Sequence, residues 1–407
     1  MEDAYFISQA GSNIENPILE QGRIAREMER QGSKLIKINL GDPGMYFRMQ
    51  KNIIWAYKKA LDDGHTNYLE EQGLPELREA VSKRYRSLYG MEFSQDDVVI
   101  TQGVSEALSF MNQSIIDDGD AAVIFRPFFT EYLTYLGLSG GVALLPALDE
   151  KNGWDINIGE LEGVLKNHKG RKPKYMLITN PNNPTGTVLS EKAMREAIEI
   201  AKDNGMFIVS DEVYDELLYS GARFTSVGNI AKGIPHMLLN GASKNYMATG
   251  LRTGFAIFPE QDAKTQALKA AFLGMAGARL SANTPSQYAM LEGLRNKGKH
   301  DEFMREKVEQ IARQSELAAK LINETGFFTA VRPNSAFYLF ARIHLDRLSI
   351  KDDKEFVELL LREQKVQLTR GSGFGMEGFI RIVTLPSEAV LAESIVRIKK
   401  FCEAHRR

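Results

Sequence analysis

Short apolar runs of strand length, separated by helical stretches, constrain the fold of this chain more than any other feature. The runs are residues 97–101, 121–125, 175–179, 206–210, 236–240 and 254–258. Helical patterns lie between many of them, such as 105–116 and 190–205, and the second begins at a serine and stops at a glycine. Strands that are apolar along their whole length, alternating with helices, indicate a mainly parallel sheet covered on both faces. We therefore predict an α/β fold.

A change of pattern near residue 290 predicts a second domain. A charged helical stretch at 297–326 leads to alternating strand patterns at 336–343 and 379–385. A chain of 407 residues is also too long for one small core. We expect an N-terminal arm at 1–45 that joins the small domain in part, a large domain at 46–288, and a smaller C-terminal α/β domain at 289–407.

Composition excludes several classes of protein. A formal net charge of −2 gives no general attraction to nucleic acid or to an anionic membrane. No apolar run approaches the roughly 18 residues of a membrane span, and the first 13 residues lack a signal-peptide pattern. The single cysteine, Cys402, allows no internal disulfide and fits a reducing compartment. We expect a cytoplasmic protein with no metal site.

Unusual polar residues follow four of the apolar runs. A glycine turn and helix start at 102–106 follow the first, and the loop NPNNPTG (180–186) follows the third. Asp211 and Tyr214 follow the fourth, and Lys244 follows the fifth. Each is typical of an ordinary turn when taken alone. Because ligands bind beyond the carboxyl ends of parallel strands, four in series indicate one binding crevice.

The residue types at these positions fit one cofactor. A lysine held away from water among small residues has a lowered pKa and attacks carbonyl groups. A buried carboxylate such as Asp211 keeps a pyridine nitrogen protonated, and a helix start with Arg252 binds phosphate. Together they fit pyridoxal phosphate better than a nucleotide. The literal G-x-G-x-x-G at 373–378 precedes a strand pattern, so it is not a dinucleotide fingerprint.

Longer segments carry a family resemblance. They are GDP (41–43), NYLEEQGLPELREAV (67–81), TQGVSEA (101–107), RPFFTEY (126–132), NPNNPTG (180–186), SDEVYDEL (210–217), SKNYMATGLRTG (243–254), NSAFYLF (334–340) and GSGFGMEGFIRI (371–382). In this order, they make the chain resemble the class I/II aminotransferases of the fold-type I pyridoxal-phosphate family over nearly its whole length. The resemblance implies a seven-stranded type of sheet in the large domain.

The resemblance also implies roles for residues around the cofactor. Lys244 would hold pyridoxal 5'-phosphate as a Schiff base and then move the proton between the substrate Cα and the cofactor. Asp211 would pair with the pyridinium nitrogen, and Tyr214 and Asn183 would hydrogen-bond the 3' oxygen. Phe129 would stack on the ring.

Phosphate and substrate residues follow from the same resemblance. The residues implied around the phosphate are Gly103, Val104, Ser105, Ser243 and Arg252. Tyr68 would reach the phosphate of a neighbouring subunit, which implies a homodimer with shared sites. Arg381 would bind the substrate α-carboxylate with two of its guanidinium nitrogens, beside Gly41 and Asn183, although its place in an alternating strand also allows a solvated side chain.

The chain departs from many relatives at two positions. Gly241 replaces a serine or threonine three residues before the lysine and supplies no hydroxyl group to the phosphate. Arg370 stands where many relatives carry proline, before the Gly-Ser of the C-terminal loop. The first departure puts one phosphate contact in question, and the second concerns a loop beside the substrate.

Several functions share this set of residues. We expect a transaminase that acts on an amino acid and a 2-oxo acid. An elimination enzyme, such as a carbon–sulfur lyase or an aminocyclopropane carboxylate synthase-like protein, would use the same residues. A sensory domain of a transcription regulator would need a basic N-terminal extension. Segments 41–43, 239–255, 282–287 and 369–375 look most like alanine aminotransferases, so we expect alanine and 2-oxoglutarate. Aspartate, aromatic amino acids and a specialised biosynthetic substrate are the alternatives.

Overall fold

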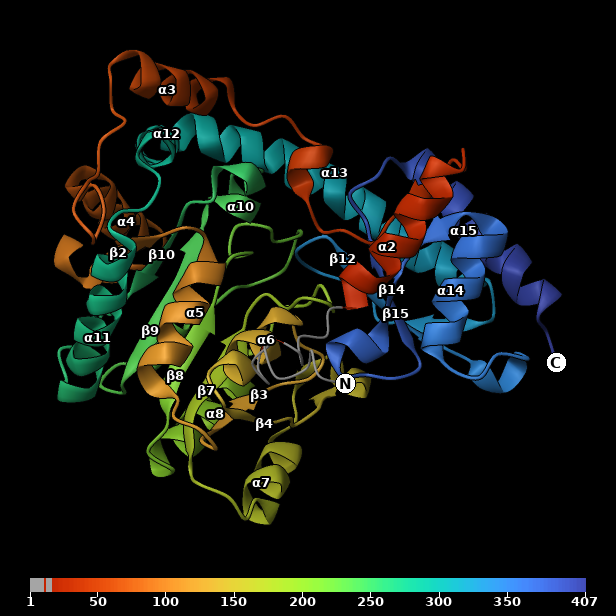
Figure 1. The fold of residues 1–407 in the computed structure, drawn as a ribbon. Coiled ribbons are helices and arrows are strands. Elements are labelled where there is room, and N and C mark those ends of the chain that lie inside the picture. Colours follow the sequence, from red (N-terminus) through yellow and green to blue (C-terminus); the bar gives the residue numbers. More distant parts are fainter. Residues whose placement is uncertain (1–10, 12–16) are drawn as a thin grey trace, which may run out of the picture.

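A seven-stranded sheet forms the centre of the larger part of the molecule (Figure 1). The computed structural model describes Gly11 and residues 17–407. In spatial order the strands are β2 (Val98–Thr101), β10 (Gly254–Ile257), β9 (His236–Gly241), β8 (Phe207–Asp211), β7 (Pro173–Thr179), β3 (Ala121–Ile124) and β4 (Val142–Leu144). Only β10 among them runs antiparallel to its neighbours. The predicted α/β fold with a mainly parallel sheet is confirmed.

Strand register brings the predicted polar turns to one edge of the sheet. Asp211 pairs with Thr179 on one side and Leu239 on the other. Gly254 pairs with both Thr101 and Gly241. The last residues of four strands therefore lie in one row, and the turns that follow them share the space beyond it.

Both faces of the sheet are covered by helices, which explains why its strands are apolar throughout. In β2, Val98 and Ile100 enter the core on one face, and Val99 enters the core on the other. One face packs against α5 (Val104–Ile115), α6 (Glu131–Leu138) and α11 (Ala263–Arg279). The other packs against α4 (Pro75–Tyr89), α7 (Ile158–Asn167), α8 (Glu191–Asp203) and α12 (Thr284–Arg295). Helix α3 (Lys51–Asp62) lies on α12 (Figure 1).

The C-terminal part builds a smaller antiparallel sheet with its own core. Its strands are β11 (Phe328–Ala330), β12 (Tyr338–Ile343), β15 (Phe379–Val383) and β14 (Thr369–Arg370). Its helices are α13 (Lys297–Glu324), α14 (Asp353–Gln364) and α15 (Glu388–Ala404). From the N-terminal region, α2 (Pro17–Arg30) lies on this side (Figure 1), and β1 (Ile36–Lys37) pairs with β13 (Val366–Gln367). These contacts support our proposed domain division, whose first segment lies partly outside the described residues.

The G-x-G-x-x-G stretch does not open a helix of the kind that binds dinucleotides. A single turn, η7 (Gly371–Phe374), and a four-residue loop lead to strand β15. Within the described part of the chain, no helix has the length and apolar character needed to cross a membrane.

Candidate active site

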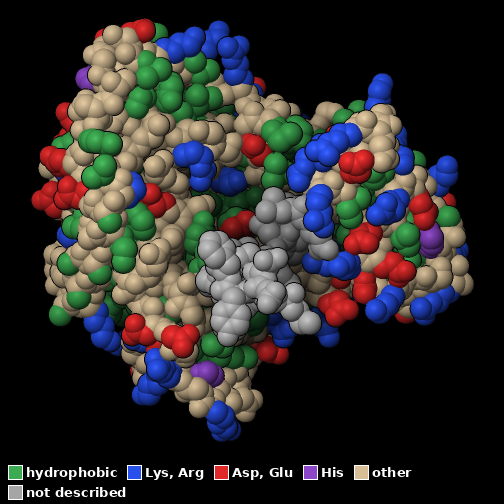
Figure 2. Space-filling view, in the orientation of Figure 1, with side chains coloured by type: hydrophobic (Ala, Val, Ile, Leu, Met, Phe, Trp, Pro, Cys, Tyr) green, Lys and Arg blue, Asp and Glu red, His purple; other side chains and the backbone are tan. Residues whose placement is uncertain are grey.

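A cavity of about 360 Å³ lies beyond the strand ends. Figure 2 shows the surface hollowed between the larger and smaller parts of the molecule. Residues predicted for the site that line the cavity are Gly41, Val104, Ser105, Phe129, Asn183, Asp211, Tyr214, Ser243, Lys244, Arg252 and Arg381. Positions far apart in the sequence thus meet in one place.

Lys244 enters the cavity from α10 (Ala242–Asn245), a single turn after β9. Its Nζ donates a hydrogen bond of 2.7 Å to the carbonyl oxygen of Gly41 and lies 5.6 Å from the centre of the Phe337 ring. Burial lowers the pKa of Lys244 to about 8, although the carboxylate of Asp42 acts in the opposite direction. Lys244 is therefore a desolvated amine with nucleophilic character near neutral pH.

Close packing of main chains requires glycine at position 241, three residues before Lys244. A Cβ atom on Gly241 would lie 2.7 Å from the carbonyl oxygen of Thr253 and 2.8 Å from the Cα of Gly254. The missing hydroxyl at Gly241 is thus the result of a backbone contact between β9 and β10.

Asp211 occupies the last position of β8, with 4% of its surface exposed. It accepts hydrogen bonds from the Tyr132 hydroxyl at 2.7 Å and from the Val213 N–H at 3.3 Å. Burial raises the pKa of Asp211 to about 6, while these two donors and Lys244 lower it. Tyr132 was not among the predicted site residues; the signal for it was its position three residues after Phe129 in RPFFTEY.

An anion-binding cradle lies at the start of α5. Gly103 is the N-cap residue of this helix, with φ 76°, and no side chain caps the helix. The first N–H groups of α5 are therefore free at the helix end beside the cavity. Arg252 lies beside it, with Nη1 3.4 Å from Ser243 Oγ. A Cβ on Gly103 would come within 2.5 Å of Arg252 Nη2, and a Cβ on Gly254 would come within 2.7 Å of the Gly103 carbonyl carbon. Glycine is needed at both positions to form this cradle.

Arg381 points into the protein from β15, with 2% of its surface exposed. Its Nη1 donates to Asn183 Oδ1 at 3.0 Å, and its Nη2 donates to the Asn39 carbonyl at 2.6 Å. Its Nε is buried and has no hydrogen-bond partner within the described structure. The alternative of a solvated outward side chain is wrong, and one donor of a buried guanidinium is left for a ligand.

Two further side chains of the cavity, Tyr338 and Glu131, were missed from the sequence. The hydroxyl groups of Tyr214 and Tyr338 lie 2.9 Å apart. A Cβ on Gly41 would lie 2.2 Å from the Tyr338 hydroxyl, so only glycine fits there. Glu131 lines the cavity at the first turn of α6. In the sequence, Tyr338 is an ordinary residue of a strand pattern, and Glu131 is an ordinary residue of a helix pattern.

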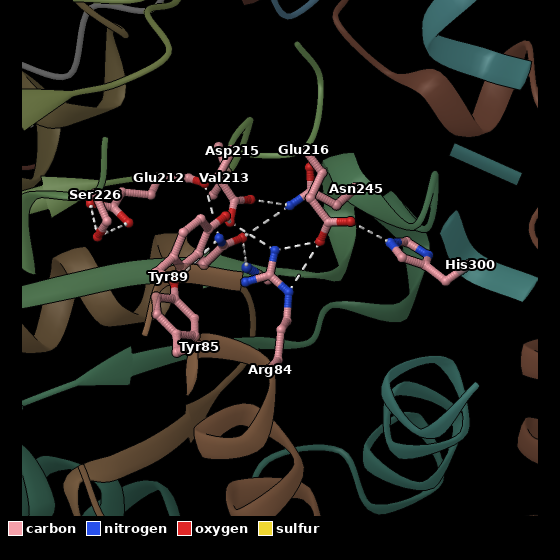
Figure 3. A network of polar contacts seen from close by, with 12 residues as sticks. Arg84, Tyr85, Tyr89, Glu212, Val213, Asp215, Glu216, Ser226, Asn245 and His300 are labelled. Atoms are coloured by element: carbon pink, nitrogen blue, oxygen red, sulfur yellow. Dashed lines mark hydrogen bonds and ion pairs between the residues drawn. The ribbon is translucent and has the colours of Figure 1, made fainter. Parts of the chain in front are cut away.

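A buried network of ion pairs and hydrogen bonds contacts α10 through Asn245 (Figure 3). Asp215, on the loop that follows β8, accepts hydrogen bonds from Arg84 at 2.7 Å, Tyr89 at 2.5 Å and Asn245 at 2.5 Å. Because Asn245 directly follows Lys244, this network connects α4 to the turn that carries the lysine.

Glu216 extends the network to α13. It pairs with Arg84 and accepts a hydrogen bond from His300 at 2.8 Å. The His300 ring stacks on Tyr246, with ring centres 4.2 Å apart. Burial alone would raise the pKa of Glu216, but Arg84 and His300 lower it to about 2. The carboxylate of Glu216 is charged near neutral pH. It connects Arg84 on α4 with His300 on α13, and His300 stacks on Tyr246, the residue that follows α10.

Tyr68 lies away from the cavity. It sits between α3 and α4, is 74% exposed, and is not a lining residue. Its predicted contact with the phosphate of a neighbouring subunit stays a prediction. Arg370, the second departure, ends β14 immediately before η7.

The model of the family described as aminotransferase class I and II matches residues 36–398. The chain belongs to this aminotransferase family. It is 32% identical to the glutamate-pyruvate aminotransferase AlaA of Haemophilus influenzae, over 97% of this chain and 96% of that protein. It is 31% identical to the aspartate aminotransferase of Bacillus subtilis, over 94% of each chain.

Solved structures show the same likeness. The alanine aminotransferase from Pyrococcus furiosus superimposes with a TM-score of 0.93 at 32% identity, over 98% of this chain and all of that one. An aspartate aminotransferase from Thermus thermophilus has a TM-score of 0.88 at 27% identity, over 97% and 99% of the two chains. The aminotransferase fold therefore extends over the whole described chain.

Aminotransferases of this family depend on pyridoxal phosphate and act on amino acids and 2-oxo acids. The cavity fits that cofactor. It combines a desolvated amine at Lys244, a buried carboxylate at Asp211 and a cradle at Gly103 that a single Cβ would fill. An amine, a carboxylate and an anion cradle match a carbonyl group, a pyridine nitrogen and a phosphate.

Proposed function

We propose that this aminotransferase transfers the amino group of L-alanine to 2-oxoglutarate. The charge of the cavity supports the proposed donor, and the name of a relative, a glutamate-pyruvate aminotransferase, supports the proposed acceptor. Among the described residues that line it, the cations are Lys244, Arg252 and Arg381. The first two serve the cofactor, so one cation remains for the substrate α-carboxylate and none for an acidic side chain. An uncharged donor such as alanine fits this arrangement better than aspartate.

Names of relatives support the same choice of substrates. One relative is named for the glutamate–pyruvate pair, and a structural neighbour is named an alanine aminotransferase. Other relatives of similar identity are named aspartate aminotransferases. The names alone do not choose between alanine and aspartate, so the cavity charge is the deciding support.

The residues of the cavity divide the work of the reaction. Bound pyridoxal phosphate supplies an electron sink for the negative charge that develops at the substrate Cα. Lys244 is the amine that would hold the cofactor and then move a proton from the substrate Cα to the cofactor, a task suited to a pKa near 8. Asp211 would keep the proton on the pyridine nitrogen. Tyr214 and Asn183 would orient the ring through its 3' oxygen, against Phe129.

Binding of the two anionic groups rests on other residues. The phosphate would lie in the cradle formed by Gly103, Val104, Ser105, Ser243 and Arg252. Arg381 would hold the α-carboxylate with its free Nε and an Nη nitrogen, since a guanidinium matches the two oxygens of a carboxylate. Gly41 would place its main chain beside the same group.

A panel of amino donors tests this proposal. Each half-reaction is followed by the absorbance change of the cofactor in single-turnover mixtures with L-alanine, L-aspartate and L-phenylalanine. We expect the highest ratio of rate to half-saturation concentration with alanine. A tenfold preference for aspartate or phenylalanine contradicts the proposed donor. Release of pyruvate from a β-substituted donor without an amino acceptor would instead establish elimination.

We also propose a homodimer in which Tyr68 completes the phosphate site of the partner. Exposed large side chains at Trp55, Leu61 and Tyr68, on α3 and the loop after it, support such a contact surface. Mixing inactive Lys244→Ala chains with chains impaired by Tyr68→Ala is expected to raise activity above that of either parent, because each hybrid dimer holds one site in which Lys244, Arg252 and the Tyr68 of the other chain are all intact. A fully active monomer in sedimentation contradicts this. We further propose a cytoplasmic location, supported by the single, buried Cys402.

A further inference from the structure

Glu131 is held at the cavity by contacts on both sides of it. The preceding Thr130 donates a hydrogen bond of 2.9 Å to the carbonyl of Gly373, in η7 of the smaller part. The following Tyr132 donates to Asp211 at 2.7 Å. Glu131, the first residue of α6, is thus held in place between η7 of the smaller part and Asp211.

The carboxyl group of Glu131 has an unused acceptor that is buried. Its Oε2 has no hydrogen-bond partner within the described structure, and the residue lines the active-site cavity. Titratable and charged groups that act on it or line the same cavity are Arg381, Lys244, Tyr338, Tyr132, Asp211, Tyr214 and Arg252. A buried acceptor without a partner is costly and calls for a function.

The proposed reaction leaves this carboxyl group facing the substrate. Arg381 takes the α-carboxylate and Lys244 serves the reacting carbon, while Asp211 is occupied by the cofactor. The two cations that act on Glu131 are Arg381 and Lys244. With the α-carboxylate at Arg381 and the reacting carbon at Lys244, the substrate side chain is the group that remains. Glu131, which is near both cations, would face that side chain.

We propose that Glu131 determines substrate specificity, in that it admits an uncharged side chain freely and an acidic side chain only together with one proton. The inference rests on the proposed function, because it takes Arg381 as the site of the α-carboxylate. It deepens that function by naming how one cavity accepts both alanine and a dicarboxylic 2-oxo acid.

The reason is the repulsion between two carboxylates in one buried site. Such a pair shares a proton, since both cannot be charged at short distance. Burial already raises the pKa of Glu131, although its own backbone N–H, Arg381 and Lys244 oppose this. A second carboxylate raises that pKa further on binding. Above the pKa of Glu131 in the free enzyme, a dicarboxylate must therefore bring in a proton, and its affinity falls up to about tenfold per pH unit.

A pair of unreactive ligands tests this in the holoenzyme. Glutarate and pentanoate have the same chain length, and only glutarate carries a second carboxylate. Dissociation constants come from the change in cofactor absorbance, and proton uptake comes from calorimetry in two buffers of different ionisation enthalpy. We expect wild type to take up about one proton with glutarate beyond any taken up with pentanoate.

The variant Glu131→Gln keeps the size of the side chain and removes its charge. We expect it to bind glutarate about tenfold more tightly at pH 8, to lose the extra proton uptake, and to bind pentanoate within about twofold of wild type. Glu162→Gln, the same change at an exposed site on α7, is the control and should change nothing.

Two results would overturn the role of Glu131: glutarate binding to wild type without extra proton uptake, or an unchanged glutarate-to-pentanoate ratio in Glu131→Gln. The first measurement needs no variant, so poor folding of the variant cannot decide the matter. Failure of alanine in the donor panel, with the glutarate effect intact, would refute the proposed donor and support the role of Glu131.

Discussion

Replacing Arg84 with methionine removes the cation from the network behind α10 while filling most of its space. The Arg84 side chain is 8% exposed and that of Asp215 is fully buried. Removing one partner of a buried ion pair typically costs about 3–5 kcal/mol, because the other charge stays buried. Asp215 keeps its bonds from Tyr89 and Asn245, and Glu216 keeps its bond from His300. We therefore expect a loss near the lower limit, about 3 kcal/mol at pH 7.

The loss should depend on pH in a known direction. The pKa of Glu216 is lowered to about 2 from an ordinary 4.5. The stabilisation linked to that shift is complete above 4.5 and disappears as the pH falls towards 2. Without Arg84 the pKa of Glu216 rises towards its ordinary value. The difference in stability between wild type and Arg84→Met should thus be largest near neutral pH and shrink below about 4.5.

Equilibrium unfolding in urea, followed by far-ultraviolet circular dichroism at a series of pH values, measures this difference. Arg86→Met is the matched control, because Arg86 lies on the same helix and pairs with Glu92 at a distance of 2.7 Å with both side chains largely exposed. Exposed pairs contribute about 1 kcal/mol or less. Equal destabilisation by the two substitutions would refute the importance of the buried network, as would a loss independent of pH.

Three further predictions concern the cavity. Borohydride reduction of the holoenzyme and peptide mass mapping should find the cofactor on Lys244, and an adduct on another lysine would remove the central assignment. Asp211→Asn should fold normally but transaminate roughly 10²-fold more slowly or worse, since a preorganised charge is lost; a rate within tenfold of wild type contradicts its role. Arg381→Lys should lower kcat/KM for alanine by roughly 10²-fold, about 2.7 kcal/mol, with little change in cofactor affinity. Equal effects on alanine and on a carboxylate-free amine would disprove the contact.

Most of the large sheet was predictable because its strands are buried on both faces. Continuous apolar runs give the strands within one or two residues, as at 206–210 for β8. Strand β4 has three residues, and Val142 in it is 51% exposed, so it left no such run. The spacing and burial of apolar residues, and not the strand propensity of single residues, determined which strands could be predicted from the sequence.

The site was predictable where its residues break a pattern. Lys244 among small residues and Asp211 after a buried strand stand out in the sequence. Glu131 was missed because a glutamate in the first turn of a helix is ordinary there. Arg84 and Asp215 were missed because they lie 131 residues apart and each resembles a surface charge until the chain is folded.

Asp211 lies on β8 and Lys244 on α10, whereas Glu131 lies on α6 and Arg381 on β15. In the proposed mechanism, separate elements therefore carry the chemistry and the selection of substrates. Laboratory evolution of new substrate ranges therefore has a defined target. Libraries confined to position 131 should retain the bond-breaking apparatus in most members, because they leave Phe129 and Tyr132 on either side unchanged. Libraries that reach α4 or the Asp211–Glu216 loop should yield mostly inactive chains, because they loosen the support on which every substrate depends.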